Sequence, residues 1–259
     1  MMAPKAPTSP LKSAAKSMVA PKAKAEPKAK VEPKDPKAEK VVTAEKSEES
    51  KTDKVEATLP PIKAEELPSY PRKIDFKQLA DEVKRAAELG FTPLVVCNGH
   101  AKEADTFFTY GGYTQIDAKW ILAETAIKKT TSVEDMQEDL RRKVVGSIKH
   151  GIPVHVAMAN SAVSFKEKFC TEKGLPQCFF NRKEFEGNAL SDVKERPYHK
   201  MLKEEDFKDW PGVPGYMKSG WYVVITTDFS MENYKEFLTD ALPHLDQMVV
   251  IEIDSASFT

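Results

Sequence analysis

The chain has 259 residues and a formal net charge of −1, with 39 lysines and arginines against 40 aspartates and glutamates. This length accommodates one domain of about 150–200 residues with an additional segment, and the balanced charge excludes a chain that is strongly polycationic or polyanionic throughout. The three cysteines, Cys97, Cys170 and Cys178, are too few and too scattered for a disulfide framework. We therefore expect reduced thiols and a reducing compartment.

Residues 1–65 are a low-complexity tail of Lys, Ala, Pro, Glu and Ser, with the repeat-like centre PKAKAEPKAKVEPKDPKAEK and no aromatic residue. Such a segment buries too little apolar surface to offset an ordering entropy of ~1–2 kcal/mol per residue. The sequence therefore predicts a disordered tail over 1–65 and a folded domain over 66–259.

The positive charge of the tail is concentrated near its start. Residues 1–40 contain ten lysines, four acidic residues and no arginine, which gives a charge of 10 − 4 = +6. Because a lysine-rich arm attracts anionic partners, we expect the tail lysines to bind an acidic polymer, with the microtubule favoured over nucleic acid. The alternative is a solubilising leader without a specific partner. The expected location is cytoplasmic or cytoskeletal, or alternatively nuclear.

Nothing in the sequence indicates a membrane partner. The first residues, MMAPKAPTSPLKSAAKSMVAPK, lack the apolar centre of a secretory signal. No apolar run approaches the ~20 residues of a membrane-spanning helix. We therefore expect no contact with a membrane.

Beyond the tail, apolar residues repeat with the periods of helices and strands. Asp75 and Gln78 form a capping-box pattern before a helix that ends at Gly90, and Ser132 is the expected cap of a second long helix. Strands are predicted over 93–97, 153–160, 220–230 and 248–254, and a strand that runs into a helix is predicted over 113–120. Further helical pieces are predicted over 105–110 and 231–242. This alternation predicts an α/β fold with a largely parallel five-stranded sheet flanked by helices.

The residues after the first predicted strand resemble a phosphate-binding loop. Residues 99–106 read G-x-x-x-x-A-D-T, against G-x-x-x-x-G-K-[ST] in a P-loop. Together with the element order over 75–255, this motif resembles a degenerate P-loop nucleoside triphosphatase with an AAA+-like core, in which a helix precedes the first strand. The resemblance implies a sheet with the strand order 5-1-4-3-2.

The resemblance also implies a nucleotide site that has lost its chemistry. Gly99 matches the first glycine of the loop, Ala104 the second glycine, Asp105 the lysine, and Thr106 the hydroxyl that contacts Mg²⁺. At ~4 Å, an aspartate in place of the lysine changes an attraction of ~4 kcal/mol into a repulsion of the same size.

Two further positions of the family lie at strand ends. Asn160 stands where an acid at the end of the third strand would order the metal, and Thr227, with its neighbours, stands where the fourth strand supplies a polar sensor. The expected cofactor is therefore none, and residual nucleotide binding through these positions and the loop stays open.

Other candidate chemistry is weaker. His100, Glu103 and Asp105 could ligate a metal, but the favoured interpretation is a solvated polar loop, so no metal site is assigned. His155 alternates within the third predicted strand and is interpreted as a core histidine with satisfied hydrogen bonds.

The connection 181–219 is long for a compact domain, and such connections are usually functional or mobile. It mixes charged residues with aromatic ones, which suits a surface for a protein partner. The alternative is that the rings anchor this insertion to the sheet. The rings are Phe185, Tyr198, Phe207, Trp210 and Tyr216.

Two functions of different class follow. The favoured one is a non-catalytic interaction or scaffold module, in which a pseudo-P-loop domain carries a basic tail that binds an acidic polymer. The alternative is a nucleotide-binding enzyme, an ATPase or GTPase with an atypical phosphate loop. The first is favoured because the loop lysine is replaced and no arginine follows Arg196 to neutralise a transferred phosphoryl group. No residue is assigned a catalytic role.

Overall fold

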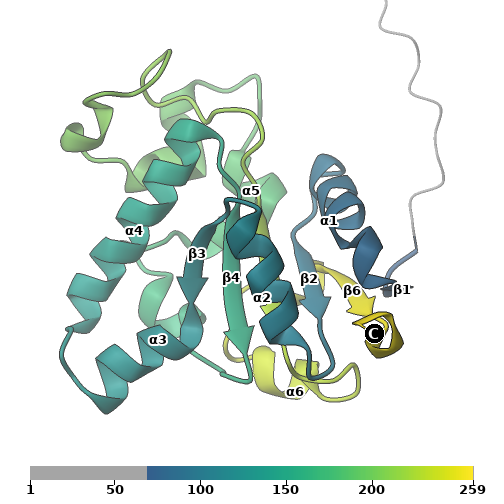
Figure 1. The fold of residues 1–259 in the computed structure, drawn as a ribbon. Coiled ribbons are helices and arrows are strands. Elements are labelled where there is room, and N and C mark those ends of the chain that lie inside the picture. The colour runs from purple at the N-terminus through teal and green to yellow at the C-terminus, as the bar shows by residue number, and fades with distance from the viewer. Residues whose placement is uncertain (1–68, 259) are drawn as a thin grey trace, which may run out of the picture. The chain divides into compact units, whose positions relative to one another are not determined.

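A single parallel sheet of six strands forms the centre of the fold. The computed structural model describes residues 69–258, and Figure 1 shows the strands side by side with their carboxyl ends pointing down. The sheet order is β1-β6-β2-β5-β4-β3. The strands are β1 (Arg72–Ile74), β2 (Pro93–Val96), β3 (Thr114–Asp117), β4 (Val154–Ala159), β5 (Val223–Thr227) and β6 (Val249–Ile253).

The α/β class and the parallel sheet are confirmed, with one strand more than the five expected. The additional strand β1 pairs in parallel with β6 at the edge of the sheet, with Arg72 opposite Ile251. Without β1, the order β6-β2-β5-β4-β3 reads 5-1-4-3-2 in terms of the five expected strands, which is the order implied by the P-loop resemblance. This agreement concerns topology alone.

Helices and short turns connect the strands. The capping box of Asp75 and Gln78 is present and opens a single 3₁₀ turn that leads into the first helix. The side chain of Ser132 accepts a hydrogen bond from the backbone N–H of Asp135 and caps α4, as expected. The helices are α1 (Leu79–Glu88), α2 (Ala101–Tyr110), α3 (Ala118–Leu122), α4 (Val133–His150), α5 (Arg182–Glu186) and α6 (Tyr234–Leu238).

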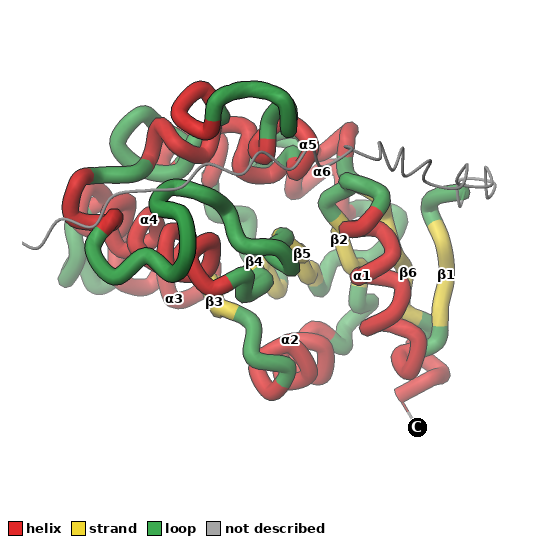
Figure 2. Tube along the Cα trace, turned by 90° about the horizontal axis from the view of Figure 1, so that it is seen from above, coloured by secondary structure: helices red, strands yellow, loops and turns green. Residues whose placement is uncertain are grey.

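The helices cover the sheet on both faces (Figure 2). One face packs against α1 and α2, through residues such as Val83 and Phe108. The other face packs against α4 and the insertion, through residues such as Leu140 and Phe179. Because both faces are covered, the central strands are mostly apolar, and all residues of β2 and β5 are buried, including the polar Thr226 and Thr227.

The last helix is shorter than predicted. A helix over 231–242 was expected, but α6 contains only Tyr234–Leu238. Phe237 is exposed and stacks on Phe229 with a ring separation of 4.5 Å. Tyr234, Leu238 and Leu242 are buried, because the chain still turns its apolar side to the sheet after the helix ends.

The aromatic residues of the insertion 181–219 mostly point inward. Phe185, Tyr198 and Trp210 are buried and belong to the core on the α4 face, and Phe207 is half-buried against it. Tyr216 is the exception, with 48% of its surface exposed. The anchoring interpretation is therefore confirmed for the three buried rings, and a partner of this insertion remains a proposal.

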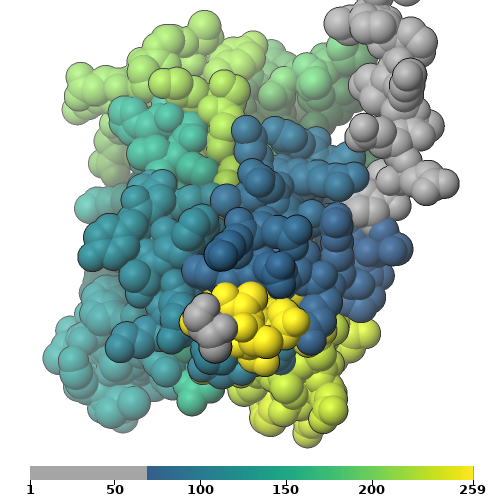
Figure 3. Space-filling model, turned by 45° about the vertical axis from the view of Figure 1, so that its right-hand side comes forward, coloured from purple at the N-terminus to yellow at the C-terminus, as the bar shows by residue number. Residues whose placement is uncertain are grey.

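The carboxyl-terminal turn (Ser255–Phe258) lies against the α1–α2 face, as the yellow atoms on the blue ones show in Figure 3. The ring of Phe258 lies 4.7 Å from that of Phe76 and stacks on His100 at 4.3 Å. His100 is thus held by an aromatic contact rather than being part of an open polar loop.

The predicted tail over 1–65 lies outside the described residues. Among residues 69–258, no helix has the length and apolar character needed to cross a membrane.

Candidate functional site

The connection between β2 and α2 is much shorter than a P-loop. Only the four residues 97–100 separate the two elements, because α2 begins at Ala101 and not at residue 105 as predicted. The cause is a tertiary contact, in which the backbone N–H of Ala101 donates to the Asp228 carboxylate at 3.1 Å. This distant acceptor satisfies a free amide at the start of the helix and allows the helix to start early.

Ala104, Asp105 and Thr106 therefore lie inside α2, whereas Gly99 lies in the short connection before it. Ala104 is buried against the sheet. Thr106 is exposed, and its hydroxyl donates to the Lys102 carbonyl at 2.7 Å within the same helix. Gly99 has φ +93°, with nothing within 4 Å of the position of a Cβ, so its conformation rather than close packing favours glycine.

The two positions at strand ends differ in exposure. Asn160 follows β4 and is exposed. Thr227 is buried at the end of β5, where its hydroxyl donates to the Ala159 carbonyl at 3.2 Å and joins the ends of β4 and β5. Of the six predicted site residues, only Asp105 and Thr106 line a common cavity.

That cavity has a volume of about 550 Å³ and lies between α2 and the carboxyl ends of β3, β4 and β5. Ligands of open α/β sheets bind at this edge. The charged residues that line it are three aspartates and two lysines, namely Asp105, Asp117, Asp228, Lys102 and Lys119.

A chain of polar contacts leads from the cavity into the core. The Thr226 hydroxyl donates to Oδ1 of Asp105 at 2.9 Å and contacts Nε2 of His155 at 2.8 Å. Nδ1 of His155 contacts Oε1 of Gln115 at 2.5 Å. His155 and Thr226 are fully buried, whereas the side chain of Asp105 is 30% exposed. Asp105 is therefore the member of this chain that can meet a ligand.

Burial shifts the pKa values of both titratable members of the chain. Burial raises the pKa of Asp105, the neighbouring Asp117 and Asp228 raise it further, and the hydrogen bond from Thr226 opposes the shift. Burial lowers the pKa of His155 to about 3. His155 is thus neutral at pH 7, so its 3.4 Å approach to Asp105 is a contact between a neutral ring and a carboxyl group, not an ion pair.

The hydrogens in this chain link the protonation of Asp105 to the buried histidine. If the neutral ring of His155 carries its hydrogen on Nδ1 and donates it to Gln115, its Nε2 can only accept a hydrogen bond, and the Thr226 hydroxyl must donate it. Thr226 has one hydrogen, which an ionised Asp105 also accepts. A protonated Asp105 can donate to Thr226 and release that hydrogen for His155. Asp105 is therefore an acid–base group whose side chain is held in place by Thr226, which in turn contacts His155.

The metal alternative finds no support in the geometry. His100 stacks on Phe258, whereas Asp105 turns toward Thr226. Within residues 69–258, no group of three or more His, Cys, Asp or Glu side chains is arranged to hold a metal ion.

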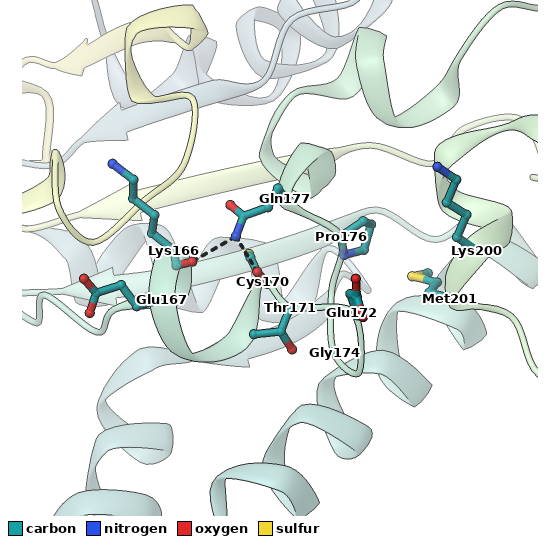
Figure 4. Close-up of a pocket in the computed structure, with 10 residues that line it drawn as sticks. All are labelled: Lys166, Glu167, Cys170, Thr171, Glu172, Gly174, Pro176, Gln177, Lys200 and Met201. Atoms are coloured by element: carbon teal, nitrogen blue, oxygen red, sulfur yellow. Dashed lines mark hydrogen bonds between the residues drawn. The ribbon is translucent and has the colours of Figure 1, made fainter.

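A larger cavity lies elsewhere, beside the short helical turn at 165–169, and has a volume of about 730 Å³. Figure 4 shows Gln177 at its centre, where the amide nitrogen donates to the carbonyls of Lys166 and Cys170. Burial raises the pKa of the Cys170 thiol, so this cysteine is protonated and a poor nucleophile. This cavity therefore offers less chemistry than the one at Asp105.

The sequence interpretation named the strand-end residues Thr226, Thr227 and Asp228 but missed two features of the site. It did not place Asp228 on the start of α2, and it did not consider Asp117. The available signal for Asp117 was its place directly at the end of a predicted strand, since the carboxyl ends of parallel strands meet at one edge of the sheet.

No family model, no curated protein and no solved structure matches this chain.

Proposed function

We propose that the folded domain is a non-catalytic interaction module with a P-loop-like topology, and that the lysine-rich tail binds an acidic polymer, the microtubule in preference to nucleic acid. The observation that carries the non-catalytic part is the contact between the Asp228 carboxylate and the N–H of Ala101 at 3.1 Å.

This contact matters because of where it lies. In P-loop proteins the start of the helix after the first strand binds phosphate, through free N–H groups and the positive end of the helix dipole. Here a carboxylate of the chain itself already accepts from the first of these amides. Three aspartates and two lysines line the same cavity, a formal balance of 2 − 3 = −1, which disfavours a nucleotide phosphate.

The proposal for the tail rests on charge. Residues 1–60 contain thirteen lysines and nine acidic residues, a charge of +4, so residues 61–259 carry −1 − 4 = −5. An acidic polymer is therefore repelled by the body of the protein and attracted by residues 1–40, which carry +6. The tail is accordingly the part of the chain suited to this partner.

One observation favours an enzyme as a second candidate. The pKa of Asp105 is raised by burial, and a carboxyl group with a raised pKa in a cavity is suited to general acid–base catalysis. This candidate corresponds to an ATPase or GTPase with an atypical loop only if Thr106 contacts a bound Mg²⁺.

A turnover assay on the full chain separates the two candidates. We expect no magnesium-dependent release of phosphate from ATP or GTP above a control without protein. Release that is lost in Thr106→Ala but kept in Thr109→Ala would contradict the proposal. Thr109 is a matched control because its hydroxyl makes the same contact one turn later, donating to the Asp105 carbonyl at 2.7 Å.

Co-sedimentation tests the tail. The full chain should pellet with microtubules at low salt and be released as salt rises, since exposed charge pairs are screened. A full-length variant with the ten lysines of residues 1–40 changed to glutamine should stay in the supernatant. Equal pelleting of both proteins would show that the tail charge is not the cause of binding.

A further inference from the structure

A third cavity lies at the opposite end of the sheet from Asp105, beside the start of α5, a helix that is labelled in the upper part of Figure 1. It has a volume of about 260 Å³ and is lined by the start of α5, by the turn at 196–198 and by residues 217–221, which lead into β5. Cavities for drug-sized ligands measure roughly 300–1,000 Å³. This one is therefore suited to a fragment-sized ligand.

Two side chains of this cavity carry buried N–H groups without an acceptor. Trp221 is 1% exposed, and its indole Nε1 has no hydrogen-bond partner among residues 69–258. The same holds for Nε of Arg196. Leaving a buried donor unsatisfied is unfavourable, and neither group can accept a hydrogen bond. Both donors are therefore satisfied only by an acceptor that enters from outside the described chain.

The cavity is also positively charged. Arg182, Arg196 and Lys218 line it, and Glu186 is the carboxylate among its lining residues, which leaves 3 − 1 = +2. Glu186 already accepts from Nε of Arg182 at 2.7 Å. The Tyr198 hydroxyl is committed as well, since it donates to the Gly215 carbonyl at 3.1 Å. Arg182 also donates from Nη1 to the Ala87 carbonyl at 2.6 Å, and Arg196 donates from Nη2 to the Ala189 carbonyl at 3.0 Å. The buried groups that lack a partner are thus donors, namely Nε of Arg196 and Nε1 of Trp221.

We propose that this cavity binds a small oxyanion, the phosphate or carboxylate group of a fragment-sized molecule. An oxyanion provides only acceptors, which match the free donors of Trp221 and Arg196. A guanidinium group pairs with phosphate or carboxylate through two parallel hydrogen bonds, and Lys218 adds charge at the exposed side. This site is separate from the nucleotide-like site at the other end of the sheet.

The indole N–H groups provide a direct test. The chain has three tryptophans, Trp120, Trp210 and Trp221, so a nitrogen–proton NMR spectrum of the labelled full chain contains three indole signals, and Trp221→Phe identifies the one of interest. Sodium phosphate and sodium acetate are titrated separately, with sodium chloride at matched ionic strength as reference. We expect the Trp221 signal to shift and saturate with phosphate or acetate, and the more tightly bound salt identifies the oxyanion.

Variants test whether this cavity is the place where the oxyanion binds. Arg196→Gln should weaken binding about tenfold or more, because it removes a charged donor, and Lys218→Gln, at an exposed position that does not endanger folding, should weaken it to a smaller extent. Arg142→Gln is the matched control, since this arginine on α4 is 65% exposed and removes the same charge. Absence of saturation with both salts, or equal affinities in all three variants, would overturn the proposal.

Discussion

The two ends of the sheet differ in the sign of their charge. At the carboxyl ends of the strands, Asp105, Asp117 and Asp228 line one cavity. At the amino ends, Arg182 and Arg196 line another. The spare hydrogen-bond donors follow the same division, because the first amide of α2 is already bound to Asp228, whereas Nε of Arg196 and Nε1 of Trp221 have no partner among residues 69–258.

This difference shows what topology determines and what it leaves to side chains. A parallel sheet places helix N-termini at the carboxyl ends of its strands, which favours anions there. In this protein three carboxylates reverse that preference, and the groups that suit an anion gather at the other end. The chain order of strands therefore indicates where a cavity forms, but residues such as Asp228 and Arg196 determine its ligand.

The largest expected effect on the free energy of unfolding concerns the amino end of the sheet, which is packed by aromatic rings. Trp221 is buried and stacks on Phe185 at 4.9 Å, so Trp221→Ala should lower the free energy of unfolding by about 3–5 kcal/mol. Urea denaturation measures this loss. Trp120→Ala is the control, because Trp120 is 42% exposed and should cost less than about 1 kcal/mol. Equal losses would mean that the aromatic packing does not hold this end.

Acid should weaken the carboxyl end through His155. The pKa of His155 is lowered in the folded protein to about 3, so the unfolded state binds a proton first as the pH falls below about 6.5. Stability should then fall by about 2 kcal/mol between pH 7 and pH 5. Denaturant titrations at several pH values measure this slope.

Asp105 acts in the opposite direction, because its pKa is raised in the folded state and its protonation stabilises that state as the pH falls. Asp105→Asn removes this opposing contribution. The dependence of the free energy of unfolding on pH is therefore compared between Asp105→Asn and the double variant that also carries His155→Gln. We expect the double variant to lose most of the slope from pH 7 to pH 5. An unchanged slope would show that His155 is not the group that titrates.

A smaller effect is expected from the contact that starts α2. Asp228→Ala removes the acceptor of the Ala101 N–H and should cost about 1 kcal/mol, as for other residues that cap a helix. Asp228→Asn, which keeps an oxygen acceptor, should cost less. Asp240→Ala at an exposed position is the control for loss of an aspartate. If Asp228→Ala and Asp240→Ala unfold alike, the contact does not stabilise the helix.

Local sequence patterns were sufficient for most of the fold. The strands over 93–97 and 248–254 were recognisable from apolar, β-branched runs, and the cap at Ser132 located the start of α4. Strand β1 was missed because it has three residues and depends on its pairing with β6. The start of α2 was misplaced for a related reason, since its capping carboxylate is 127 residues away in the chain.

The candidate sites were harder to predict. The sequence interpretation placed Asp105 in a phosphate loop, whereas the structure turns it toward Thr226 and the buried His155. The cavity at Arg196 and Trp221 was not recognised, because the two residues belong to separate segments and their shared feature is a missing acceptor. Such an absence becomes visible only when all partners of a buried group are known.

The smallest effect is expected from removal of the lysine-rich tail. Removing residues 1–60 should leave the thermal midpoint nearly unchanged, because a segment with this composition contributes little packing. The affinity for phosphate or acetate, followed by the indole signal of Trp221, should also be unchanged, since the cations that line this cavity are Arg182, Arg196 and Lys218. Calorimetric melting and the NMR titration of the shortened chain measure both. A midpoint lower by many degrees would mean that the tail packs on the domain, and tighter oxyanion binding without the tail would mean that its acidic residues compete for the basic cavity.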